Sequence, residues 1–373
     1  MNKTIKQSSF NANDAGFGYM LYVVLSVLIL AGARLLIRAG VAYTDLFYYI
    51  YAFFVEAIFA LSVFLVAKIK NRQMIKASGL NKKVNTASVV MCAVISLICL
   101  FGLGRLSDYF IEILSSMGYH STSASVNVKT VWDLLIYTIL IAALPAICEE
   151  LLFRGLMLNG LSKYGKHVAI YVSAFAFMIM HGSPDQTVHQ FILGVVFGYI
   201  VYYTGNLWLT IIIHFFNNFF VLVATFFMNM LPAAETAGGA SSGNQVITLI
   251  ISYAVSVLIV ALSVYLVIIS IKRLIKENSV VNNIPEYVSS VDLKALKIER
   301  KNEEIAPEKA NLDLEEEASD GGIVVEKIGT PEPAVISEKN KEKLDIITIT
   351  MFVVTTIYLA VDWILALVDG FHG

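Results

Sequence analysis

The chain has 373 residues, of which 57% are hydrophobic and only 15% are charged, and its mean hydropathy is +0.71. Soluble domains carry about 25% charged residues, so this composition excludes an ordinary soluble protein and indicates an integral membrane protein. The formal net charge of −2 does not itself argue for or against nucleic acid, because the charges are segregated along the chain. The partners we expect are the lipid bilayer and a membrane-associated substrate, and no nucleic acid.

Nine apolar segments are candidates for membrane-spanning helices, because a span needs roughly 20 apolar residues. In chain order they are 17–37, 46–67, 87–103, 131–158, 168–181, 188–203, 207–230, 246–271 and 346–368. The fifth and sixth are short for separate crossings. Together the segments predict an all-α, polytopic membrane bundle with an eight-helix core and one appended C-terminal span.

Composition divides the chain into three parts. Residues 1–275 are expected to form the membrane core, and its first span to be retained, since the apolar run is longer than the core of a signal peptide. Residues 276–345 are polar, acidic and dotted with prolines, which predicts a disordered cytoplasmic linker. Residues 346–373 would form the C-terminal transmembrane helix and tail.

Basic residues in short loops predict the orientation. The loop after the second segment contains Lys68, Lys70, Arg72, Lys76, Lys82 and Lys83. It should therefore be cytoplasmic, and alternation from it places the N-terminus inside and the C-terminus outside. Only Arg34 and Arg38, at the outer end of the first segment, disagree with this assignment. The short loops and the lack of an organelle signal favour a bacterial plasma membrane.

Two adjacent glutamates and an arginine interrupt the fourth segment. Ionisable side chains cost about 2.5–3.5 kcal/mol at the centre of a membrane helix, so they indicate a functional site. Glu150 and Arg154 have i, i+4 spacing with the acid first, which favours an ion pair that acts as a structural brace. Glu149 points about 100° away from Glu150 and keeps no local counter-charge, which suits a general base for water. The alternative is that Glu149 pairs with another helix.

A histidine of the fifth segment is expected at the same depth as Glu149. Glu149 and His181 are each sixteen residues from Gly165, the centre of the intervening turn. In an antiparallel hairpin both side chains would lie about 24 Å along the helices from that turn. A lone histidine on an apolar face is usually a core residue, but one level with an unpaired glutamate is a candidate catalytic partner.

A third polar cluster lies in the seventh segment. His214 and Asn218 are at i, i+4 and share a helix face, whereas Asn217 is expected to point away. They could join helices by hydrogen bonds, or donate hydrogen bonds to a developing oxyanion. Alternatively, His181 and His214 could bind a Zn²⁺ ion that carries the attacking water, although no His-Glu-x-x-His motif is present. The sequence does not choose between these chemistries.

The three clusters resemble the CPBP membrane proteases, which include CAAX-prenyl endopeptidases and bacteriocin-processing or immunity proteins. The family pattern is Glu-Glu-x-x-x-Arg, then Phe-x-x-x-His, then His-x-x-x-Asn, and this chain contains all three in order within residues 131–220. The resemblance implies an eight-helix core with a cavity facing the cytoplasm. It also implies that Glu149 activates water with His181 as its partner, and that His214 and Asn218 hold the oxyanion.

We therefore expect an intramembrane endopeptidase, of metallo or glutamate type, that cleaves a membrane-associated peptide of the prenylated CAAX or bacteriocin-leader kind. The alternative is a non-catalytic scaffold, immunity protein or transporter that uses the polar cluster for binding. A transporter should show internal repeats and interrupted helices in matching halves, and the sequence shows neither.

Overall fold

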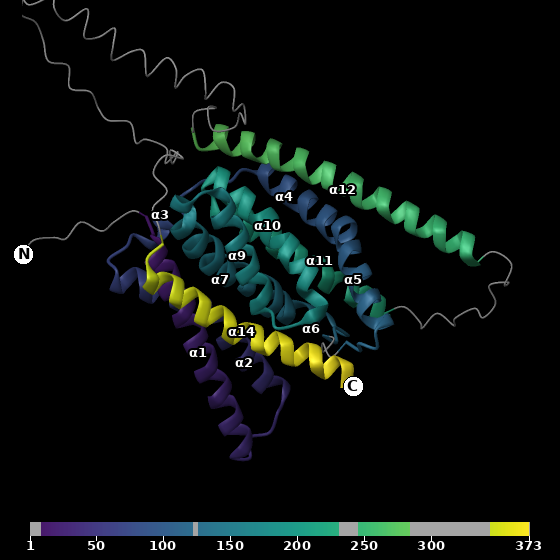
Figure 1. Cartoon of the computed structure of the whole chain (residues 1–373), viewed down its shortest axis with the longest axis horizontal. Coiled ribbons are helices and arrows are strands. Elements are labelled where there is room, and N and C mark those ends of the chain that lie inside the picture. The colour runs from purple at the N-terminus through teal and green to yellow at the C-terminus, as the bar shows by residue number, and fades with distance from the viewer. Residues whose placement is uncertain (1–8, 122–125, 231–244, 284–343, 373) are drawn as a thin grey trace, which may run out of the picture.

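The computed structural model describes residues 9–121, 126–230, 245–283 and 344–372, and every regular element in these ranges is helical (Figure 1). The elements are α1 (Ala12–Arg38), α2 (Asp45–Ile69), α3 (Met74–Ala77), α4 (Thr86–Ile98), η1 (Cys99–Leu103), α5 (Gly104–Ser116), α6 (Val131–Tyr137), η2 (Thr138–Ala143), α7 (Leu144–Glu150), η3 (Leu151–Leu158), α8 (Asn159–Leu161), η4 (Ser162–Tyr164), α9 (Lys166–Met180), η5 (Pro184–Gln186), α10 (Thr187–Thr204), α11 (Leu207–Met230), α12 (Gln245–Val281) and α14 (Ile346–His372). The turns η1, η2 and η3 are π-helical.

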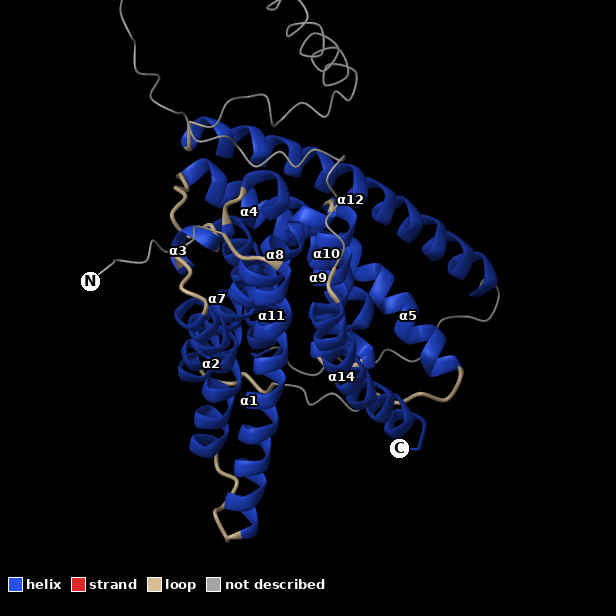
Figure 2. Ribbon diagram, turned by 60° about the vertical axis from the view of Figure 1, so that its left-hand side comes forward, coloured by secondary structure: helices blue, strands red, loops and turns tan. Residues whose placement is uncertain are grey.

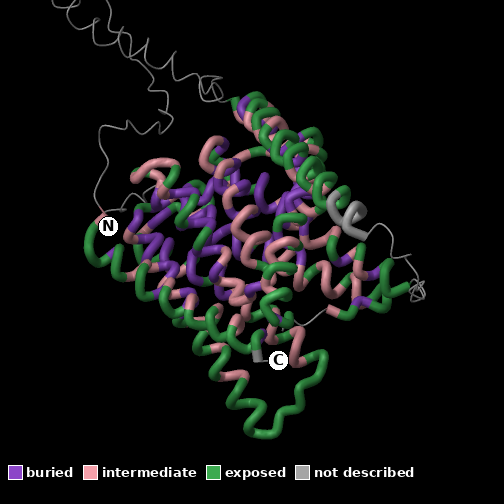
Figure 3. The backbone as a smooth tube through the Cα atoms, turned by 45° about the vertical axis from the view of Figure 1, so that its right-hand side comes forward, coloured by how far each residue is buried: buried purple, intermediate pink, exposed green. Residues whose placement is uncertain are grey.

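Eight helices of the described part are long and apolar enough to cross a membrane, which confirms the expected polytopic helical bundle. The exception among the nine expected segments is α9, whose 15 residues reach only about 22 Å, less than the roughly 30 Å of a hydrocarbon core. Figure 3 shows buried residues gathered in the middle of the bundle and exposed residues on its outer helices. Large apolar side chains such as Trp132 and Leu258 are exposed, as contact with lipid requires.

The two C-terminal helices pack along the core (Figures 1 and 2). Helix α12 contacts α4, η1 and α10, and it continues to Val281, so the expected linker cannot begin at residue 276 as predicted. Most of that expected linker, residues 284–343, lies outside the described residues. Helix α14 begins at Ile346 and contacts α1 and α9, and the Trp363 Nε1–H donates to Thr187 Oγ1 at 2.8 Å. Of the helices that carry the polar clusters, the last expected span therefore contacts α9, which ends next to His181.

A seam of small residues holds α9 and α10 together. A Cβ atom on Gly194 would lie 2.9 Å from Ala174, and one on Gly198 would lie 2.9 Å from Ile170. A Cβ atom so close to a neighbour would force the neighbouring atoms to move, most severely at Gly194 where the neighbour is backbone, so glycine permits this close approach of the two helices. The seam fixes α9, and with it His181, against α10.

The two ends of the bundle are chemically different. The basic loop, residues 68–83, lies beside the α10–α11 turn, where Asn206 Nδ2 donates to the Lys83 carbonyl at 3.0 Å and Trp208 Nε1 donates to the Leu80 carbonyl at 2.9 Å. We call this the basic end. The opposite end carries η5, which connects α9 to α10.

Candidate active site

The paired glutamates close α7, a short helix with a π-helical turn on either side. Pro145 lies in the first turn of α7 and has no N–H group, so it cannot bond the carbonyl of Ile141 four residues before it. Asn218 of α11 donates its Nδ2–H to that carbonyl at 2.9 Å. The irregular helix is thereby tied to α11 just before it presents Glu149 and Glu150.

Glu150 and Arg154 form the ion pair that their spacing indicated. Arg154 Nη1 lies 2.7 Å from Glu150 Oε1, and both side chains are fully buried. The guanidinium carbon also lies 4.1 Å from the ring centre of Phe177 and 5.1 Å from that of Phe197. These cation–π contacts place the charge between α9 and α10, so the pair joins three helices.

His214 of α11 connects the two glutamates. Its Nδ1 lies 3.2 Å from Glu150 Oε1, and its Nε2 lies 3.9 Å from Glu149 Oε2. A carboxylate accepts hydrogen bonds, so Nδ1 carries the ring proton and donates a hydrogen bond to Glu150. His214 is buried, with 4% of its surface exposed, so it acts first as a bridge between acids.

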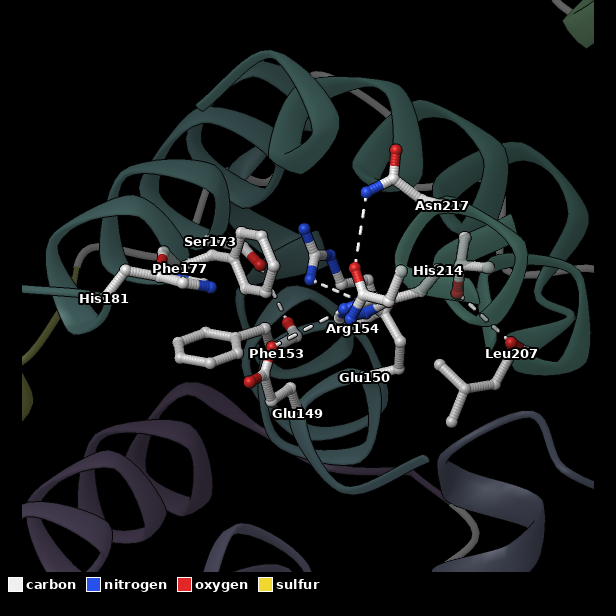
Figure 4. Close-up of polar contacts among 12 residues, drawn as sticks. Glu149, Glu150, Phe153, Arg154, Ser173, Phe177, His181, Leu207, His214 and Asn217 are labelled. Carbon is white, nitrogen blue, oxygen red and sulfur yellow. Dashed lines mark hydrogen bonds and ion pairs between the residues drawn. The ribbon is translucent and has the colours of Figure 1, made fainter. Parts of the chain in front are cut away.

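His181 caps the end of α9, and its Nδ1 lies 2.8 Å from the carbonyl oxygen of Phe177. A carbonyl only accepts, so Nδ1 must donate, and the Nε2 of the neutral ring carries a lone pair. That atom is available to accept a proton or to orient a water molecule. Figure 4 shows His181 at the end of α9 and Glu149 at the end of α7.

A cavity of about 880 Å³ collects the candidate catalytic residues. Glu149, His181, His214 and Asn218 all line it, so the structure brings the four together. Glu150 and Arg154 do not line it, in keeping with a brace behind the site. The level placement of Glu149 and His181, inferred from their equal distance to Gly165, agrees with a shared cavity.

Asn217 does not point away from this site as the sequence analysis expected. It is buried, lines the same cavity, and donates its Nδ2–H to Asn218 Oδ1 at 3.3 Å. The physical reason is that i+3 and i+4 neighbours share a helix face, so His214, Asn217 and Asn218 form one stripe. Asn218 has one amide hydrogen bonded to Ile141, which leaves the other for a substrate oxygen.

The cavity opens at the end of the bundle opposite to the basic end. It reaches η1 and α5 at Leu100 and Asp108, η5 at Asp185 and the second half of α11 at Thr225. The basic loop precedes α4 and lies beside the first turn of α11. A cytoplasmic basic loop and a cytoplasmic cavity, both expected above, are therefore incompatible in this fold.

Comparison with known proteins identifies the segment that carries these clusters. A family model described as type II CAAX prenyl endopeptidase Rce1-like matches residues 131–220. This segment belongs to the Rce1-like family. The match confirms the resemblance drawn from the three motifs and points to a CAAX-type intramembrane protease. No curated protein and no solved structure gives a match.

The cavity also contains groups that the sequence analysis did not select. Glu56 of α2 lines it and lies outside the Rce1-like segment, and His189 of α10 lines it within that segment. Glu56 is the one acidic residue inside the apolar run 46–67. An ionisable side chain inside a membrane helix indicates a functional site, so the argument made for Glu149 applies equally to Glu56.

A catalytic zinc site needs three protein ligands, and no group of three His, Cys, Asp or Glu side chains in the described ranges is arranged to hold a metal. One nitrogen of His181 is bonded to a backbone carbonyl, and both nitrogens of His214 face glutamates. His214 is therefore arranged as a partner of carboxylates, and His181 as a partner of the α9 backbone.

Proposed function

We propose that this protein hydrolyses a peptide bond in a membrane-associated substrate, using water activated by Glu149. The observation that carries the proposal is the shared cavity of Glu149, His181, His214 and Asn218, behind which Arg154 neutralises Glu150. Glu149 has no arginine or lysine partner in the described residues, and a carboxylate without such a partner is free to accept a proton from water. Membership of residues 131–220 in a family of prenyl endopeptidases supports the reaction class.

The cavity residues account for each proton in the hydrolysis. The oxygen of water attacks the carbonyl carbon of the substrate while Glu149 takes one proton from that water. His181 Nε2 orients the water through its lone pair, and the remaining amide hydrogen of Asn218 donates to the oxyanion. The C–N bond then breaks, and the proton on Glu149 passes to the leaving amine. The products are an acid and an amine, and Glu149 returns to its starting charge.

The first test is cleavage by the purified full-length protein. A fluorogenic farnesylated CAAX peptide and the same peptide without its lipid serve as probes, each with and without a zinc chelator. We expect hydrolysis of the farnesylated probe at a rate that the chelator does not change, because carboxylate and histidine supply the chemistry. Loss of activity with chelator and recovery with Zn²⁺ would select the metalloprotease instead. No cleavage of either probe would favour a binding scaffold.

The orientation of the cavity can be measured with single cysteines. The three native cysteines of the chain, Cys92, Cys99 and Cys148, are buried and will not react with a membrane-impermeant maleimide. Lys129 is exposed near the cavity end, and Lys76 is exposed in the basic loop. The positive-inside rule predicts that Lys129→Cys reacts in intact bacterial cells, whereas Lys76→Cys reacts only after permeabilisation.

The reverse labelling pattern would place the cavity mouth in the cytoplasm and contradict the orientation drawn from charge. The result also separates substrate classes. A cytoplasmic mouth fits a prenylated tail made in the cytoplasm, whereas an external mouth fits a leader or bacteriocin-type peptide that has crossed the membrane.

A further inference from the structure

We infer that Glu56 supplies a second carboxyl group to the active site. Glu56 shares one proton with Glu149 and holds the Glu149 carboxylate in position. The inference rests on the proposed function of Glu149. It adds a positioning residue from α2, a helix outside the Rce1-like segment.

Helix packing places the two carboxyl groups at one level. Helices α2 and η3 run in the same direction, since the end of η3 meets the basic loop where Asn159 Nδ2 donates to the Ala77 carbonyl at 3.2 Å. The rings of Phe59 and Phe153 meet between them at 6.1 Å. Glu56 precedes Phe59 by three residues, about 4.5 Å, and Glu149 precedes Phe153 by four, about 6 Å.

The side chain of Glu56 faces inward. It lies one turn before Phe59 and two turns before Val63, both of which are buried, so it occupies the buried stripe of α2. It lines the same cavity as Glu149, and its Oε2 is buried without a hydrogen-bond partner among the described residues.

No free cation balances the two acids within the described part of the chain. Arg154 is bonded to Glu150, and His214 donates to the same carboxylate. Arg105 also lines the cavity, but it is paired with Asp108. Two neighbouring carboxyl groups, each with a buried oxygen that has no hydrogen-bond partner among the described residues, cannot both ionise at low cost, so the pair retains one proton.

The shared proton has a direct consequence for hydrolysis. A protonated Glu56 donates a hydrogen bond to the Glu149 carboxylate, which keeps that carboxylate charged and fixed until it takes the proton from water. The proton of Glu56 is not consumed, since the proton taken from water leaves with the amine. Glu56 therefore acts through Glu149 and not on the substrate.

Glutamine and leucine at position 56 separate positioning from packing. Glu56→Gln keeps a neutral hydrogen-bond donor of the same size, so kcat on the farnesylated CAAX peptide should stay within about threefold of wild type. Glu56→Leu keeps the volume without a donor, and kcat should fall about tenfold to a hundredfold with KM unchanged, the loss expected for a hydrogen bond to a charged group. Glu112→Gln, an exposed acid of α5 bonded to Tyr253, is the matched control and should match wild type.

The pH dependence of kcat/KM would not change if Glu56 only filled space, so it distinguishes positioning from packing. The alkaline limb of kcat/KM in the wild type should include ionisation of Glu56, and Glu56→Gln, whose amide never ionises, should lose that limb while keeping the acid limb. Identical profiles for wild type and Glu56→Gln, or equal kcat for the Gln and Leu variants, would overturn the inference.

Infrared spectroscopy tests the proton independently of peptidase activity. At neutral pH the wild type should show a carboxylic acid C=O band that disappears in Glu56→Gln and persists in Glu112→Gln. A band that persists in Glu56→Gln overturns proton sharing even if no probe is cleaved. If Glu149→Gln is inactive while all Glu56 variants match wild type, only the role of Glu56 fails and the proposed function stands.

Discussion

Replacing Glu149 by glutamine should lower kcat/KM for a cleaved peptide by about 100-fold to 10,000-fold, the range that a general base contributes. Glutamine has nearly the same shape but cannot take a proton from water. The Glu150–Arg154 pair should remain, because Glu149 takes no part in it. The measurement is the initial rate on the fluorogenic farnesylated peptide, compared with wild type at equal protein concentration.

His181→Ala provides the companion test. If Glu149 and His181 act on one water molecule, each single variant loses most of the activity, and the double variant is no slower than Glu149→Gln alone. Glu149→Gln and His181→Ala should each unfold within a few degrees of the wild-type unfolding temperature. If the decrease in activity of the double variant equals the product of the two single decreases, the two residues act separately. A fully active Glu149→Gln would exclude Glu149 as the base.

Local spacing predicted the parts of the site that lie on one helix or one hairpin. The i, i+4 rule was sufficient for Glu150 and Arg154, because both partners are fixed by the same helical turn. Counting residues from Gly165 was sufficient to bring Glu149 and His181 to one cavity, since a hairpin has a single register at its turn. The membrane bundle itself follows from the lengths of the apolar runs.

Contacts between distant helices could not be predicted in this way. Pro145 signals a lost hydrogen bond, but nothing in the sequence says that Asn218, on another helix, would satisfy the Ile141 carbonyl. Both nitrogens of His214 are directed at glutamates for the same reason, so its bridge role depends on how α11 packs against α7. Glu56 was detectable as an intramembrane acid, but its place beside Glu149 required the α2–α7 packing.

Replacing Arg154 by methionine should destabilise the protein by about 3–5 kcal/mol, because it leaves the fully buried Glu150 carboxylate without its partner. Methionine fills much of the volume between Phe177 and Phe197 but loses both cation–π contacts. The three buried cysteines allow the change to be measured. A thiol-reactive fluorogenic dye reports their exposure during heating, and Arg154→Met should react at a temperature well below that of wild type.

The exposed pair Arg105 and Asp108 is the matched control for stability. Their charged atoms lie 3.2 Å apart, but both side chains are more than half exposed, so Arg105→Met should cost about 1 kcal/mol or less. Adding Glu150→Gln to Arg154→Met removes the unpaired charge and should recover most of the lost stability, leaving the missing cation–π contacts as the remainder. If the double variant is as unstable as Arg154→Met, the cost lies in packing around the guanidinium and not in the uncompensated carboxylate.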